Sequence, residues 1–283
     1  MIRIRRMTVA DVPLGMRLKA KAGWNQTEAD WRRFLALEPD GCFVAEYDGV
    51  AAATLTTCTF GPVAWIAMVL VDEPLRGRGL AKALLSHATA YLEGRGVRSI
   101  RLDATALGRP LYEKLGFTVE YKLARYEGVL PARGAAPRPP GVGGEVLGAG
   151  HLEGIARLDR AVTGTDRSKL LLRLLVETPG EVKAVEEGGE VSGFRMARPG
   201  AQAWQLGPCV ASAAAGPVLL RDAWWRHAGR AVYLDVPTGN TAAVALAEGA
   251  GLTVQRHFLR MGRGPSVGEH TEQLWTSSGP EKG

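Results

Sequence analysis

The chain has 283 residues, of which 46% are hydrophobic, which is enough for two domains with separate cores. No apolar run reaches about eighteen residues, and no long apolar stretch follows the N-terminus, so we expect neither a membrane span nor a signal peptide. The net charge is +6, and 27 of the 35 basic residues are arginine. They are spread along the chain without interleaved aromatic residues, which argues against nucleic-acid binding.

Cysteine and histidine give no sign of a metal site or a disulfide framework. The three cysteines (Cys42, Cys58 and Cys209) are scattered, form no C-x-x-C pair and suit a reducing cytoplasm. The five histidines show no metal-ligand spacing. We therefore expect a cytoplasmic protein without a metal.

A Pro/Gly-rich stretch divides the chain into halves of similar length. Residues 128–144 read GVLPARGAAPRPPGVGG, a composition that disfavours both helix and strand. The sequence thus predicts a domain over residues 1–127, a linker over 128–144 and a second domain over 145–283. The halves share a faint pattern: a strand ending at 102–104 or 234–236, then a helix leading to Gly116 or Gly251, which suggests a duplicated domain.

The first half reads as mixed α/β. We predict helices over 11–22, 79–95 and 109–115, and a further helix beginning after the N-cap residue Thr27. The predicted strands cover 2–5, 42–47, 50–57, 64–71, 99–104 and about 117–125. Asp48-Gly49 favours a hairpin turn between two of them. The apolar run AWIAMVLV at 64–71 indicates a strand buried on both faces.

This buried strand runs into an Arg/Gly-rich turn and then directly into an amphipathic helix. The turn reads Arg76-Gly77-Arg78-Gly79 and continues with Leu80-Ala81-Lys82. Unpaired N–H groups at a helix N-terminus, together with the helix dipole, favour phosphate oxygens. The glycines allow a close approach of the backbone, and the arginines add positive charge. An ordinary strand–helix connection is the alternative.

The pattern Arg76-x-x-Gly79-x-Ala81 resembles the pyrophosphate-binding signature of the GNAT acyltransferases. Downstream, Leu111-Tyr112-Glu113-Lys114-Leu115-Gly116-Phe117 is similar to that superfamily's Leu-Tyr-x-Lys-x-Gly-Phe motif. The resemblance extends to a bacterial subgroup with two tandem domains. It implies an α/β fold of two GNAT-like domains, each with a mixed, mostly antiparallel sheet and a splayed parallel strand pair flanked by helices.

The resemblance also implies roles for individual residues. Acetyl-CoA would lie between the splayed strands, pairing with the backbone of Val69, Leu70 and Val71, and one N–H there would bind the thioester carbonyl. The turn from Arg76 to Lys82 would hold the pyrophosphate. Tyr112 would give a proton or a hydrogen bond to the leaving thiolate, with a core aromatic as the alternative.

Three further assignments stay open. Asp103 is either a general base or a carboxylate that caps the following turn. The segment Trp24-Asn25-Gln26 either lines the acceptor site or serves packing and capping. Asp166, Arg167 and Arg195 either line a cleft or are solvated charges.

The second half has lost the chemical motifs. Its counterpart of the phosphate turn, 204–220, lacks the signature and contains Pro217, which has no N–H. Ala247 stands where the tyrosine would be. We therefore expect this domain to bind no CoA, and we expect residues 274–276 to add an edge strand to its sheet.

The sequence as a whole predicts an acetyl-CoA-dependent N-acetyltransferase acting by direct attack of an amine, without a covalent enzyme intermediate. The expected acceptor is a small-molecule amine. Two alternatives remain: a GNAT-derived sensor that binds acyl-CoA or a metabolite with little turnover, and an N-acetyltransferase of proteins or peptides. The oligomeric state and the identity of the amine are not predicted.

Overall fold

The computed structural model describes residues 1–132 and 149–281. Their contacts form two compact units. The first comprises Met1–Val119 and Met261–Ser266, and the second comprises the described parts of Glu120–Arg260 together with Val267–Glu281. Residues 120–127, predicted as part of the N-terminal domain, therefore cluster with the second unit. Of the predicted linker, Gly128 and Val129 end a strand, and residues 133–144 lie outside the described residues.

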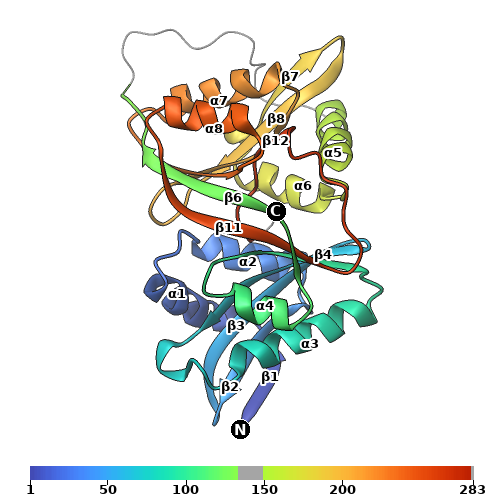
Figure 1. Ribbon diagram of the computed structural model, residues 1–283, viewed down its shortest axis with the longest axis vertical. Coiled ribbons are helices and arrows are strands. Elements are labelled where there is room, and N and C mark those ends of the chain that lie inside the picture. Colours follow the sequence, from blue (N-terminus) through green and yellow to red (C-terminus); the bar gives the residue numbers. More distant parts are fainter. Residues whose placement is uncertain (133–148, 282–283) are drawn as a thin grey trace. The chain divides into compact units, whose positions relative to one another are not determined.

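The first unit is a mixed sheet flanked by helices (Figure 1). Its elements are β1 (Ile2–Arg6), α1 (Val12–Lys21), α2 (Glu28–Leu37), β2 (Cys42–Tyr47), β3 (Val50–Phe60), β4 (Val63–Val71), α3 (Leu80–Gly94), β5 (Ser99–Ala104) and α4 (Arg109–Lys114). The strands lie in the order β1-β2-β3-β4-β5, followed by the end of β11 (Thr253–Arg263). All pairs from β1 to β4 are antiparallel, and β4 and β5 are parallel.

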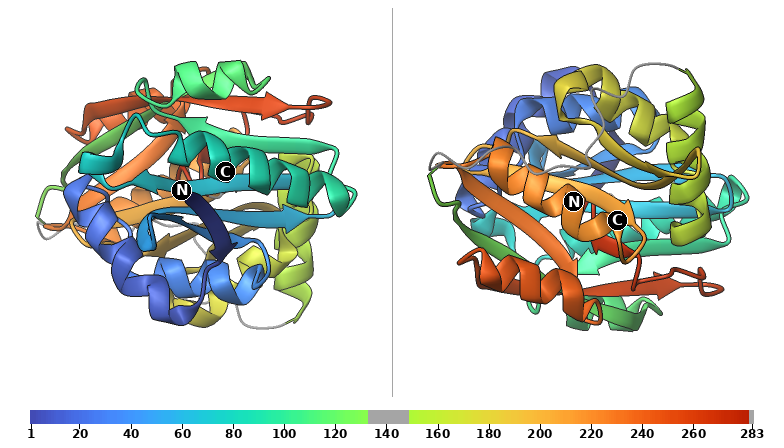
Figure 2. Two further views of the ribbon diagram at one scale, coloured as in Figure 1. Left: turned by 90° about the horizontal axis from the view of Figure 1, so that it is seen from below. Right: turned by 90° about the horizontal axis from the view of Figure 1, so that it is seen from above.

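Local sequence explains these elements. Asp48 and Gly49 have φ of 50° and 84°, the two positive values that a tight hairpin turn requires between β2 and β3. The Thr27 backbone N–H donates to the Asp30 carboxylate at 2.8 Å, which completes a capping box at the start of α2. The apolar β4 is buried along most of its length, since α3 covers one side of these strands and α1 and α2 the other (Figure 2).

The second unit repeats this plan. It contains β6 (Thr118–Val129), α5 (Ala149–Thr163), α6 (Ser168–Glu177), β7 (Lys183–Glu187), β8 (Glu190–Arg198), β9 (Trp204–Ala211), α7 (Ala215–Arg226), β10 (Ala231–Pro237), α8 (Thr241–Gly249), most of β11 and β12 (Leu274–Thr276). Its strand order is β11-β6-β10-β9-β8-β7, with β12 paired to β9. Again one parallel pair, β9 and β10, occurs in the interior.

The predicted edge strand at 274–276 does form, but it is not at an edge. β12 pairs with β9, and β9 is also bonded to β8 and β10. The sequence pattern shows that these residues are extended, but not which strand they join.

Candidate functional site

The parallel strands β4 and β5 of the first unit separate halfway along their length. They pair at Val63↔Ser99, Ala64↔Ile100 and Trp65↔Arg101 and no further. Beyond that point β4 carries a bulge, because Thr56 lies opposite Ala67 while Thr54 lies opposite Leu70. The bulge lets β4 diverge from β5 and opens the sheet.

Met68 forms this bulge with a strained backbone. Its φ is 51°, in the left-handed region that non-glycine residues seldom adopt. The buried Thr54 hydroxyl donates to the Met68 carbonyl at 2.9 Å and holds the distorted residue against β3. Sequence reasoning missed this feature, since neither a glycine nor a proline marks it.

After the bulge, β4 presents backbone donors to the opened side. The Asp72 N–H donates to the Ala52 carbonyl of β3 at 2.8 Å. Successive N–H groups of a strand point in opposite directions, so those of Val71 and Val69 point away from β3. Of the three predicted residues, Val69 and Val71 are therefore the donors, and Leu70 contributes a buried side chain.

The turn that follows is exposed and leads into a helix whose first N–H groups have no acceptor within the helix. Gly77 and Gly79 have φ of 77° and 86°, and a Cβ on Gly77 would have open space around it. The Ala83 N–H makes the first helical bond, to the Gly79 carbonyl at 2.9 Å. The N–H groups of Leu80, Ala81 and Lys82 precede it and have no acceptor within the helix. These donors and the helix dipole fit a pyrophosphate.

Charged side chains fix both ends of the turn. Asp72 receives hydrogen bonds from Arg17 and, at 3.0 Å, from Lys21, and these lower its pKa below the usual range. Arg78 donates to the Tyr47 hydroxyl at 3.1 Å and covers its ring. Arg76 is half-exposed, and its guanidinium lies 3.6 Å from the Glu73 carboxylate. Such an exposed pair is weak, so Arg76 can turn toward an anion.

Tyr112 lies on α4, the helix that follows β5. Its ring packs edge-on against Phe117 at a centroid distance of 6.0 Å. No hydrogen bond to its hydroxyl is found within the described residues, and burial raises the pKa of the phenol to about 12. A Cβ on Gly108 would approach the ring to 2.7 Å, so the glycine leaves room for this ring position. The phenol is therefore protonated at neutral pH.

Asp103 and the segment Trp24–Gln26 keep their open assignments. Asp103 is half-buried near the end of β5. In the turn after β5 the Gly108 N–H donates to the Thr105 carbonyl at 3.1 Å and to the Thr105 hydroxyl at 3.4 Å. Asn25 and Gln26 are each 5% exposed, whereas Trp24 is partly exposed, so only Trp24 offers substantial surface to an acceptor.

The fold brings most of the predicted residues to one opening in the sheet. Val69, Val71 and the turn follow one another along the chain at its β4 side. Asp103 lies on β5, the strand at its other side, and Tyr112 lies on α4, the next helix along the chain. The segment 24–26 joins α1 to α2, and both of these helices cover the sheet.

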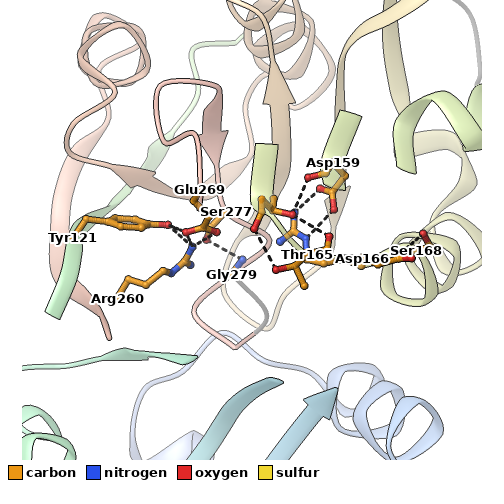
Figure 3. Close-up of polar contacts among 11 residues, drawn as sticks. Tyr121, Asp159, Thr165, Asp166, Ser168, Arg260, Glu269, Ser277 and Gly279 are labelled. Carbon is orange, nitrogen blue, oxygen red and sulfur yellow. Dashed lines mark hydrogen bonds and ion pairs between the residues drawn. The ribbon is translucent and has the colours of Figure 1, made fainter. Parts of the chain in front are cut away.

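The three polar residues noted in the second unit differ in their surroundings. Arg167 donates to Asp159 at 2.6 and 3.0 Å, and Arg195 donates to Asp222 at 2.6 Å; both arginines are buried. Asp166 is exposed and pairs with Arg160 and Ser168, as Figure 3 shows in part. The two arginines are thus paired within the unit and are not solvated.

Two further observations limit the chemistry of the part of the chain that the structure describes. There, no cluster of three or more His, Cys, Asp or Glu side chains could hold a metal ion. Among the same residues, no helix combines the length and the apolar composition needed to cross a bilayer.

Comparison with known proteins adds the family. Residues 16–117 match the acetyltransferase (GNAT) family, and residues 155–276 match an acetyltransferase (GNAT) domain. An N-alpha-acetyltransferase of Arabidopsis thaliana, MAK3, is 32% identical over 104 residues, which are 34% of this chain and 54% of that protein. The chain thus spans about half the length of this relative.

Two longer similarities cover both halves. The uncharacterized N-acetyltransferase YitH of Bacillus subtilis is 24% identical over 231 residues, 80% of this chain and 79% of that protein. The structure of a candidate acetyltransferase from Pyrococcus horikoshii superposes with a TM-score of 0.86 at 22% identity, covering 100% of this chain and 96% of the other. With one match in each half, the chain belongs to the GNAT acetyltransferase family and carries two GNAT domains in tandem.

Proposed function

We propose that the chain transfers the acetyl group of acetyl-CoA to the amine of a small molecule, in the first unit. The observation that supports this most strongly is the opening between β4 and β5, which lies directly before an exposed glycine-rich turn with free N–H groups. The free cysteines fit a cytoplasmic setting, which we include in the proposal.

In this proposal acetyl-CoA supplies an activated acyl group with a thiolate leaving group. The turn residues 76–82 hold the pyrophosphate through backbone donors and arginine charge. The N–H groups of Val69 and Val71 hydrogen-bond the pantetheine arm and stabilise the negative charge that develops on the thioester carbonyl oxygen.

The amine nitrogen attacks that carbonyl directly, and the carbon–sulfur bond breaks. The Tyr112 hydroxyl donates a hydrogen bond to the departing sulfur, which takes a proton from water and ends as a thiol, while the nitrogen releases one proton to water. The numbers of protons released and taken up therefore balance without a strong base. This fits the fact that no residue has been assigned as a general base. Trp24 is proposed to form part of the wall around the acceptor.

A thermal-shift titration with acetyl-CoA tests the cofactor site. Ligand at a hundred times its dissociation constant should stabilise the folded chain by about 2.7 kcal/mol, which corresponds to a few degrees in melting temperature. We expect this shift in the wild type and not in Arg76→Glu/Gly79→Asp.

A matched control comes from the other end of α3. Arg95→Glu/Gly96→Asp makes the same two changes at an exposed arginine and at a glycine with φ of 81°. This control should keep the ligand-induced shift. Loss of the shift in both variants, or in neither, would contradict a cofactor site at the turn.

The Arabidopsis relative is named an N-alpha-acetyltransferase, and this favours one second candidate, N-acetylation of protein or peptide termini. Release of free CoA, followed with a thiol reagent, distinguishes the acceptors when a panel of small amines is compared with a peptide library. Robust turnover with peptides alone would replace the small-molecule proposal. Binding of acetyl-CoA without turnover on either panel would favour a sensor.

A further inference from the structure

The second unit contains a counterpart of the cofactor opening. β9 and β10 are parallel and pair only at Trp204↔Val232 and Gln205↔Tyr233. β9 also carries a bulge against β8, because Arg195 lies opposite Cys209 while Ala197 lies opposite Leu206. The bulge again follows the last paired residues of the parallel strands.

The registers align the two bulges residue by residue. Thr54↔Leu70 corresponds to Arg195↔Cys209, and Thr56↔Ala67 corresponds to Ala197↔Leu206. Pro208 therefore takes the place of Val69. Proline has no N–H, so the second unit lacks one of the two strand donors assigned in the first unit.

Residues 274–281, the tail, fill this second opening. β12 pairs antiparallel with the end of β9 at Leu274↔Val210 and Thr276↔Cys209, and the Ala211 N–H donates to the Gln273 carbonyl at 2.9 Å. On the other side, the Ser277 N–H donates to the Asp235 carbonyl of β10 at 2.8 Å. The tail thus bonds to both separated strands.

Trp275 blocks the helix that would receive a phosphate group. Its indole lies against Gly216 in the first turn of α7, so closely that a Cβ on Gly216 would overlap the ring. The indole Nε1–H donates to the Ala211 carbonyl at 3.1 Å. Ser212 caps the helix, since its hydroxyl accepts from the Ala215 N–H at 3.1 Å. In the first unit, by contrast, a Cβ on Gly79 just before α3 would meet only Ile2, at 3.9 Å.

The rest of the tail is also buried and hydrogen-bonded. Thr276, Ser277 and Ser278 are fully buried, and Arg198 donates to the Ser278 carbonyl at 2.9 Å and pairs with Glu281. The Gly279 N–H donates to the Ser277 hydroxyl at 3.2 Å (Figure 3). These contacts are those of a core segment.

We propose that the tail is the permanent occupant of the second unit's cofactor groove. It supplies to β9 and β10 the backbone partners that a pantetheine arm would supply, and Trp275 covers the N-terminus of α7. The second unit accordingly binds no acyl-CoA and depends on the tail to complete its sheet. This concerns the second unit alone and does not rest on the function proposed for the first.

A double-mutant cycle between Gly216 and Trp275 tests the position of the tail in the full chain. Gly216→Ala in a helix normally raises stability, but here the new methyl group meets the indole. We expect Gly216→Ala to lower the melting temperature by several degrees in the wild type. In the Trp275→Leu background, which removes the outer ring, the same change should lower it much less or raise it.

Gly249→Ala serves as the control, because it lies at the end of helix α8 with nothing near its Cβ position. It should have the same small effect in both backgrounds. Equal destabilisation by Gly216→Ala in both backgrounds would overturn the placement of Trp275. Trp275→Leu keeps an apolar β12 residue, so the background is expected to fold.

Calorimetric titration with acetyl-CoA tests the closure of the groove. We expect one site per wild-type chain and none in Arg76→Glu/Gly79→Asp. A second site per wild-type chain would overturn the proposal. If the wild type binds no acetyl-CoA, the function proposed for the first unit fails, while the Gly216–Trp275 cycle still decides where the tail lies.

Discussion

The Tyr112 phenol is a weaker acid than the thiol that it is proposed to assist. Burial raises its pKa to about 12, whereas a thiol such as cysteine has a pKa near 8.5. Complete proton transfer from Tyr112 to the thiolate is therefore uphill, and the phenol acts chiefly as a hydrogen-bond donor while the charge develops on sulfur. The final proton can then come from water.

Tyr112→Phe should accordingly lower kcat by about ten- to a hundredfold, since a hydrogen bond to a charged group is worth about 1.5–3 kcal/mol. The dissociation constant of acetyl-CoA should stay within about twofold, because the ring and its packing on Phe117 are retained. Steady-state kinetics and calorimetry measure the two quantities. An unchanged kcat would remove Tyr112 from the mechanism.

The same pKa predicts the alkaline side of the pH profile. A phenol whose pKa is raised from 10 to about 12 keeps its proton to higher pH, so donation persists where an ordinary tyrosine would begin to ionise. We expect kcat to rise as the acceptor amine loses its proton, and not to fall before about pH 10. A fall in kcat with an apparent pKa near 9 that disappears in Tyr112→Phe would show that burial does not raise the pKa of the phenol.

Gly108 controls where that phenol points. Gly108→Ala would bring a methyl group to 2.7 Å from the Tyr112 ring and force the ring to move. We expect a loss of kcat that approaches that of Tyr112→Phe, with the affinity for acetyl-CoA retained. Gly94→Ala, at a helical glycine with open space, is the control and should leave kcat unchanged.

At the scale of elements, one side-chain hydrogen bond holds the β4 bulge against β3. Thr54→Val removes the hydroxyl that holds the Met68 carbonyl, and Thr57→Val removes a bond of the same length from Thr57 to the Gly41 carbonyl. Both threonines are buried in β3, so each change should lower the free energy of unfolding by about 1 kcal/mol.

Only Thr54→Val should also weaken acetyl-CoA binding and lower kcat. It alone releases the bulge that directs the Val69 and Val71 N–H groups into the opening. Chemical denaturation and calorimetry, run on both variants, separate the two effects. Equal loss of binding in Thr54→Val and Thr57→Val would mean that the loss reflects stability and not the geometry of the bulge.

Elements marked by a few neighbouring residues were predictable from the sequence. Features that depend on which strands pair with each other were not. Thr27, Asp48-Gly49 and the run 64–71 mark a helix N-cap, a hairpin turn and a buried strand, and the structure confirms all three. The bulge at Met68 has no such mark. The strand at 274–276 was predicted as extended, but its partner depends on the separation of β9 from β10. The exposed glycine-rich turn was predictable because consecutive residues of the sequence form it.

At the scale of the whole molecule, the course of the chain does not follow the apparent duplication. The chain passes through the first unit, then the second, returns to the first for Met261–Ser266 and ends in the second. The returning segment is well fitted: the Thr118 hydroxyl donates to the Gly262 carbonyl at 3.4 Å, and a Cβ on Gly264 would overlap the Arg98 carbonyl. The first unit is thus completed by residues from the far end of the sequence.

A fragment of residues 1–130 should therefore fold poorly by itself, although it holds every residue assigned to the acetyl-CoA site. Without the end of β11, strand β5 becomes an unpaired edge, and such edges promote aggregation. We expect the fragment to elute as aggregate in size-exclusion chromatography and to bind acetyl-CoA at least tenfold more weakly than the full chain. A monomeric fragment with full-chain affinity would show that the first 130 residues form a complete domain and that the returning segment is dispensable for the site.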